Sequence, residues 1–201
     1  ALTPRFAVLF EDGVPRSGAT AAGPTMGQTT TMTTAAAGPA VSPILARWNA
    51  FRKLPGGRLL FSLSVGRYVR YSGTVGARVR ELEPGSSVVT MRDRAAVRNH
   101  LESVHACAQV TVGELASGLA MLAGMPPGMR AIVTGLEIRY DKKARGLITA
   151  TGTAPIPVPD ERREYEVAAT LTDEAGDAVS TLTVRWLVGP NTPPPGGGGA
   201  S

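Results

Sequence analysis

The stretch Val104–Ala123, VHACAQVTVGELASGLAMLA, decides the fold. It has the length and composition of a helix, is apolar on nearly every side and carries small residues throughout. A helix that is apolar nearly all round must be covered on all sides. Its many alanines and glycines favour close wrapping by neighbouring backbone. The sequence therefore predicts a central helix surrounded by other elements.

Four strand-like runs follow this helix and are joined by short turns. They are Ala131–Tyr140, Gly146–Ala154, Tyr165–Leu171 and Ala178–Val188. Because short turns cannot connect parallel strands, these strands are expected to be antiparallel. A long antiparallel sheet around one central helix is the hotdog fold, of the α+β class. The alternative is a generic α+β domain with a helix on one face.

The segment before the long helix is expected to hold a helix and a hairpin. Ser42 and Pro43 suit a helix start, because serine caps a helix and proline fits its first position. The segment Arg58–Val65 is expected to be a short strand or lead-in. The strands Gly76–Leu82 and Ser87–Met91, around a Pro-Gly turn, are expected to form the hairpin.

The 201 residues are expected to contain one domain, residues 41–188. Residues 1–40 are rich in Ala, Thr, Gly and Pro, and residues 189–201 in Pro and Gly, so both are predicted to be disordered. Met26 and Met32 are candidate translation starts within the first segment.

The net charge of +5 and the pI near 9.9 allow two classes of partner. A basic surface attracts nucleic acid or a phosphorylated cofactor such as coenzyme A, although arginine bias from a GC-rich genome also explains the charge. Nucleic acid is the weakest candidate, because the basic residues look scattered and no aromatic residues interleave with them.

The cysteine and histidine counts exclude a disulfide within the chain and a Cys/His metal site. The chain has one cysteine and two histidines. These counts predict a reduced, cytoplasmic protein with no metal. The sequence also predicts no membrane span, since no apolar run approaches about 20 residues, and no signal-peptide core.

Glu114 is the strongest candidate for chemistry. A carboxylate within an apolar helix costs several kcal/mol unless it is paired, and the helix holds no lysine or arginine. Burial raises the pKa of a carboxylate and suits it to act as a general base or nucleophile. The alternative is a solvent-facing position, but Gln109 is the only other long polar residue on the helix.

The loop Arg98–His105 is the second candidate, because it leads into the helix. The first backbone N–H groups of a helix are unsatisfied and can hold a developing oxyanion. Ser103 suits the N-cap equally well, and His105 could simply order the first turn. Nine residues separate His105 from Glu114, which would place them on opposite faces of one helix. Joint action would then require the loop and the acid to come from different subunits.

Two further features are weighed. Cys107 is expected to be a buried small residue, since nothing positions a base beside it. The turn Lys142–Arg145 is basic and could meet phosphate groups, or could be a solvated hairpin tip.

Asn99, His105 and Glu114 follow one another at six and nine residues, and this spacing resembles, to within one residue at the acid, the N-x5-H-G-G-x7-D/E signature of PaaI-type hotdog thioesterases. The stretch Arg98–Gly146 looks more like an uncharacterised branch of that superfamily, which carries His-Ala in place of His-Gly-Gly. The resemblance covers residues 43–188.

The resemblance implies a homo-oligomeric acyl-CoA or acyl-carrier-protein thioesterase whose active site is shared between subunits, with coenzyme A entering only as part of the substrate. Glu114 would activate water or attack the thioester, and Asn99 would orient water or substrate. His105 would shape the turn. Ala106 N–H, with Ser103 and Thr134 nearby, would hold the oxyanion or substrate. The coenzyme A phosphates would meet the basic turn, through Lys142, Lys143 and Arg145.

The chain departs from the signature at several positions. Ala106 and Cys107 replace two glycines, and a Cβ at position 106 narrows the approach to the oxyanion site. Glu102 stands where many members carry glycine. These departures bear on catalysis and leave the predicted fold unchanged.

Two other functions remain open. A hotdog dehydratase uses a histidine and a helix acid 14 residues apart, which His100 and Glu114 match, although the dehydratase His-Phe-Pro-Gly sequence is absent. A protein that binds acyl thioesters without hydrolysing them is the other alternative.

Overall fold

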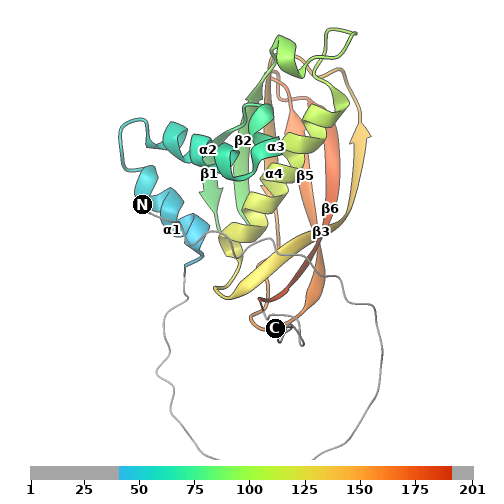
Figure 1. Ribbon diagram of the computed structural model, residues 1–201. Coiled ribbons are helices and arrows are strands. Elements are labelled where there is room, and N and C mark those ends of the chain that lie inside the picture. Colours follow the sequence, from blue (N-terminus) through green and yellow to red (C-terminus); the bar gives the residue numbers. More distant parts are fainter. Residues whose placement is uncertain (1–40, 192–201) are drawn as a thin grey trace, which may run out of the picture. The chain divides into compact units, whose positions relative to one another are not determined.

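The computed structural model describes residues 41–191, which form one α+β unit (Figure 1). The predictions for residues 1–40 and 192–201 lie outside the described residues. In chain order the elements are α1 (Pro43–Phe51), α2 (Gly57–Tyr68), α3 (Arg70–Thr74), β1 (Arg78–Glu83), β2 (Ser86–Arg92), the 3-10 helix η2 (Ala95–Val97), α4 (Ala106–Gly124), β3 (Met129–Tyr140), β4 (Leu147–Thr153), β5 (Arg163–Thr172) and β6 (Ala178–Pro190).

The strands form a single antiparallel sheet of six strands in the order β1-β2-β4-β5-β6-β3. Figure 1 shows α4 lying along one face of this sheet. Strand β5 illustrates how the core is built, since Tyr165, Val167, Ala169 and Leu171 are buried while the residues between them are exposed. A long central helix packed on an antiparallel sheet is the hotdog fold, as the sequence predicts.

The small residues of α4 allow the sheet to approach it closely. A Cβ at Gly152 of β4 would lie 2.5 Å from the Ala116 carbonyl oxygen, and a Cβ at Gly113 would lie 2.7 Å from the Leu182 methyl carbons. The Ser87 hydroxyl donates to the same Ala116 carbonyl at 2.7 Å. The helix is therefore held at contact distance by the strands around it, which confirms the close wrapping expected from its composition.

Helix α4 does not fit the prediction that no apolar run approaches the length of a membrane span. Within residues 41–191 it is the one helix, 19 residues long with a mean hydropathy of 1.3, that could cross a bilayer by length and composition. However, 72% of that window is buried inside the fold. Burial against the sheet accounts for its apolar character.

The N-terminal helices include one element that the sequence analysis assigned wrongly. Helix α1 begins as predicted, with the Ser42 hydroxyl accepting from Leu45 N–H at 3.3 Å and Pro43 in the first turn. In contrast, Arg58–Val65 lies in α2, not in a strand. Phe61 of α2 packs edge-on against Trp48, with ring centroids 5.1 Å apart. The helical conformation buries Phe61 against α1 and leaves the neighbouring leucines exposed.

The C-terminal strand extends further than expected. Gly189 and Pro190 belong to β6 and pair with Arg130 and Met129 of β3. Asn191 N–H then donates to the Gly128 carbonyl at 2.8 Å. The prediction that the folded domain ends at residue 188 is therefore wrong for residues 189–191, because β3 and the residue before it are long enough to pair with them.

Candidate active site

The loop before α4 is organised around the Asn99 side chain. Its carbonyl oxygen accepts from Leu101 N–H at 2.9 Å, and from Ser103 N–H and the Ser103 hydroxyl at 3.2 Å each. These donors fix the orientation of the amide, so Nδ2 is the group that points away from the loop. No acceptor for Nδ2 lies within residues 41–191. Asn99 therefore holds the loop with one atom and leaves a donor available with the other.

Glu102 sits at the tightest point of the same loop. Its φ of 53° lies in the left-handed region, which favours glycine. Glu102 therefore adopts a backbone conformation that glycine would take without strain.

His105, not Ser103, caps α4. The His105 Nδ1 accepts from Cys107 N–H at 3.0 Å, so in this conformation Nδ1 carries no proton. Ser103 is buried and its hydroxyl donates to Asn99 instead. The interpretation of Ser103 as the N-cap is wrong, because the Ser103 hydroxyl donates to Asn99 and Ser103 lies three residues before the first helical residue, Ala106.

The cap leaves one backbone donor open at the helix start. Val104 N–H donates to the Ala144 carbonyl at 2.9 Å and His105 N–H donates to the Val97 carbonyl at 2.8 Å. Among the described residues, Ala106 N–H has no acceptor. This is the group at which a partial positive charge of the helix is available to an oxyanion.

The Glu114 carboxylate lies half-buried in the middle of α4. Burial raises its pKa above the usual value for a glutamate. No hydrogen bond or salt bridge reaches its side-chain oxygens from any part of the chain that the structure describes. On the same side of the helix, Val110 and Leu122 are only partly covered and Cys107 is exposed. The sheet therefore leaves this side of α4 open.

The relation between His105 and Glu114 differs from the expectation. His105 has extended backbone, with φ −60° and ψ 143°, and precedes the first helical residue. The prediction that the two residues lie on opposite faces of one helix is therefore wrong. The relevant pair is Ala106 and Glu114, whose backbones lie about 12 Å apart along the helix axis at 1.5 Å per residue.

The basic turn between β3 and β4 lies beside the start of α4, since its Ala144 carbonyl accepts from Val104 N–H. Its three cations are not equivalent. Lys142 Nζ contacts Asp173 at 2.7 Å and Asp177 at 2.6 Å, whereas Lys143 and Arg145 are exposed. The two carboxylates balance the charge of Lys142, so Lys143 and Arg145 are the better candidates for contact with a phosphate.

Thr134 lies away from this group of residues. It sits at a β-bulge in β3, and its hydroxyl donates to Glu164 Oε2 at 2.6 Å. Glu164 belongs to the exposed set of β5 residues, on the sheet face that does not contact α4. Within one chain the structure thus brings Asn99, Ser103, His105, Ala106 and the basic turn together, but leaves Glu114 and Thr134 apart from them.

Two further polar residues at the helix start, Tyr140 and Gln109, were not predicted from the sequence. The Tyr140 hydroxyl donates to the Ala106 carbonyl at 3.2 Å, and burial, followed by the neighbouring Cys107, raises its pKa. Gln109 is buried, where its amide donates to the Val104 carbonyl at 3.1 Å and accepts from Ser180 at 2.9 Å. No local pattern marks either role, since both depend on long-range partners.

Cys107 differs from its predicted burial. The thiol is exposed in the first turn of α4. It belongs to the side of the helix that the sheet does not cover, so the prediction of a buried cysteine is wrong. Within residues 41–191, no group of three His, Cys, Asp or Glu side chains is arranged to hold a metal ion.

These features place the chain in a class of hotdog proteins with a helix-borne acid and an ordered loop at the helix start. Residues 57–188 match the family described as a domain of unknown function, DUF4442, and the chain belongs to that family. No curated protein matches the chain.

Solved structures with the same fold include several proteins described as thioesterases. The structural-genomics protein APC5556 has a TM-score of 0.64 at 24% identity, covering 73% of this chain and 98% of its own. PA5026 from Pseudomonas aeruginosa, described as a "probable thioesterase", has a TM-score of 0.60 at 24% identity, covering 68% and 97%. The thioesterase SAV0944 from Staphylococcus aureus has a TM-score of 0.54 at 15% identity, covering 60% and 99%. At these identities the likeness establishes the fold.

Proposed function

We propose that this protein hydrolyses an acyl-CoA or acyl-carrier-protein thioester to a free acid and a thiol. The observation that carries the proposal is the half-buried Glu114 carboxylate, which has no polar partner within residues 41–191 and whose pKa is raised by burial. A structural carboxylate at this position would be expected to have a partner. The spacing of Asn99, His105 and Glu114, which resembles PaaI-type thioesterases, supports the same reaction.

The chemistry follows from the groups at the site. Glu114 takes a proton from water, and the resulting hydroxide attacks the thioester carbonyl. The tetrahedral oxyanion forms at Ala106 N–H, where the helix dipole favours negative charge. Collapse of the intermediate expels the thiolate. Direct attack by Glu114, followed by hydrolysis of the mixed anhydride, uses the same residues.

A shared active site fits this chain better than a site within one subunit. About 12 Å of helix separates the backbones of Ala106 and Glu114, and the side of α4 that carries Glu114 is open. Strand β3 ends the sheet and exposes Ile132 and Val133, and such an edge favours pairing with another copy. We infer a homo-oligomer, acting in the cytoplasm, in which one subunit supplies the loop and its partner supplies the acid.

The first test is hydrolysis of a panel of short, medium and aryl acyl-CoA thioesters, with release of free thiol as the measurement. Glu114→Ala is expected to lower kcat by about 10²- to 10⁴-fold, the usual contribution of a general base. Glu83→Ala, an exposed acid on β1 at the opposite edge of the sheet, is the control and should retain activity. Full activity in the Glu114 variant would exclude the mechanism. Enoyl formation from a 3-hydroxyacyl thioester would favour the dehydratase alternative, and binding without turnover would favour a carrier or sensor.

Mixing two inactive variants tests whether the site is shared. Glu114→Ala and Asn99→Ala chains are refolded together, so that about half of the dimers contain one chain of each kind. If the site is shared, each mixed dimer holds one intact site, and the mixture recovers about a quarter of wild-type activity. If acid and loop act within one chain, every site carries a substitution and no activity returns.

A further inference from the structure

Helix α2 carries leucines on the side that faces solvent. Gly57, Phe61 and Ser62 are its buried residues. On the opposite side, Leu59, Leu60 and Leu63 are 48%, 51% and 50% exposed. At 100° per residue these leucines and Arg67 fall within an arc of about 100°. A surface helix normally turns such a stripe towards the core, so this stripe lacks a partner in the chain as the structure describes it.

The charge around this stripe has one sign. Residues 41–80 contain eight lysines and arginines and no aspartate or glutamate, although the whole chain has 16 acids. Arg67 and Arg70 are exposed, and Tyr71 is 69% exposed. We call Leu59, Leu60, Leu63, Arg67, Arg70 and Tyr71 the α2–α3 face. It joins apolar and cationic side chains with no opposing charge in the segment.

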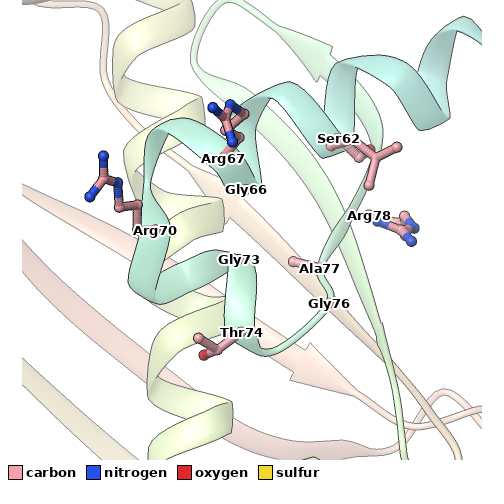
Figure 2. Close-up of a pocket in the computed structure, with 10 residues that line it drawn as sticks. Ser62, Gly66, Arg67, Arg70, Gly73, Thr74, Gly76, Ala77 and Arg78 are labelled. Carbon is pink, nitrogen blue, oxygen red and sulfur yellow. The ribbon is translucent and has the colours of Figure 1, made fainter.

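A shallow hollow adjoins the apolar stripe. It has a volume of about 350 Å³ and includes Leu63, Arg67, Arg70 and Arg78 in its lining, so the leucines and arginines form one continuous surface. Figure 2 shows the three arginine side chains leaving the rim in different directions instead of converging on one point. A single phosphate ion would favour convergent donors. Splayed donors suit a broad anionic surface.

Three occupants of this face can be compared. A second copy docked by two-fold symmetry would bring the same cationic patch against itself, which is unfavourable. A folded acidic protein would need concavities matched to the protruding leucines. The surface of an anionic bilayer accepts protruding leucines into its interface and places arginine and tyrosine at head-group level.

We propose that the α2–α3 face binds the surface of membranes that contain anionic phospholipids. Leu59, Leu60 and Leu63 enter the interface, and Arg67 and Arg70 contact lipid phosphates. The helix lies in the plane of the membrane without crossing it. Helix α2 packs on β1, at the opposite edge of the sheet from β3, so binding leaves the β3 edge free. The inference does not depend on thioester hydrolysis.

The test is co-sedimentation of the full chain with vesicles of 30% phosphatidylglycerol and 70% phosphatidylcholine. Two variants probe the face. The leucine variant combines Leu59→Ser, Leu60→Ser and Leu63→Ser, and the arginine variant combines Arg67→Ser and Arg70→Ser. Matched controls are Ile156→Ser with Val158→Ser, and Arg162→Ser with Arg163→Ser, all exposed outside residues 41–80. Circular dichroism verifies that each variant is folded.

We expect the wild type to bind these vesicles and to dissociate as salt is raised, because salt screens the attraction. Loss of the two arginines should weaken partitioning roughly 10- to 30-fold, and loss of the leucines at least as much, while both controls keep wild-type binding. No binding at low salt, or equal binding by all variants, overturns the proposal. The proposal is also overturned if the wild type does not bind vesicles and the leucine variant has a lower oligomer mass in solution than the wild type. That result would assign the face to contact with a second copy of the chain.

Discussion

The start and the middle of α4 differ in how far the chain itself satisfies their polar groups. At the start, Asn99, His105 and the Ala144 carbonyl accept from the N–H groups of Leu101, Ser103, Cys107 and Val104, and Ala106 N–H has no acceptor within residues 41–191. In the middle, the Glu114 carboxylate has no partner within residues 41–191. The comparison teaches that one chain satisfies most polar groups of the loop but leaves the acid without a partner, which agrees with the shared site proposed above.

Asn99 gives the largest expected effect on stability, because its side-chain oxygen accepts three hydrogen bonds within the loop. Asn99→Ala removes the acceptor for Leu101 and Ser103 and should cost about 1–3 kcal/mol of unfolding free energy, together with activity. Asn99→Asp keeps an acceptor but loses the Nδ2 donors. It should keep the melting temperature within a few degrees and still lose about 10- to 100-fold in kcat. Urea unfolding and thiol release measure the two quantities. Equal activity in Asn99→Asp and wild type would leave Asn99 with the loop role alone.

His105 should give a smaller effect, confined to the helix start. His105→Ala removes the cap on Cys107 N–H and should destabilise the fold by about 1 kcal/mol. His105→Asn restores a capping oxygen and should recover most of that stability. If activity falls in His105→Ala and recovers in His105→Asn together with stability, His105 acts by ordering the start of the helix. Activity lost equally in both, with the Asn variant stable, would instead require the imidazole in the reaction.

Glu114 gives the smallest effect on stability, with a defined dependence on pH. Burial raises its pKa in the folded state, so the folded state holds this proton to higher pH than the unfolded state. The contribution of the protonated Glu114 to stability is complete below the pKa that Glu114 has in the unfolded state. It is lost as pH rises through the pKa that Glu114 has in the folded state. Glu114→Gln should therefore melt one or two degrees above wild type at pH 7, with the gap closing as pH approaches the ordinary glutamate value of 4.5.

Thermal melts of Glu114→Gln across pH 4 to 8 measure this gap, with Glu137→Gln as the exposed control. The rate of wild-type hydrolysis should also fall as pH is lowered through the raised pKa, since the base must be unprotonated. A gap that is constant with pH would mean that the carboxylate gains a partner when the oligomer forms.

The sequence by itself determined the architecture. The apolar run Val104–Ala123 needed extensive cover, and the short connections after it allowed only antiparallel strands. The structure covers this helix with the sheet but leaves the side that carries Glu114 open. Glu114 could also be selected from sequence, because a carboxylate within an apolar helix is costly wherever the helix lies. Periodicity and composition are local properties, and they were sufficient for these conclusions.

Only the tertiary structure decided how the loop and the outer helices are used. The cap moved from Ser103 to His105 because the Asn99 amide takes the serine hydroxyl. Residues 58–65 are helical, with Phe61 packed against Trp48 and the leucines beside it exposed. These outcomes depend on which distant groups lie within reach of each donor or apolar side chain in the folded chain. Sequence spacing does not record such competition between partners.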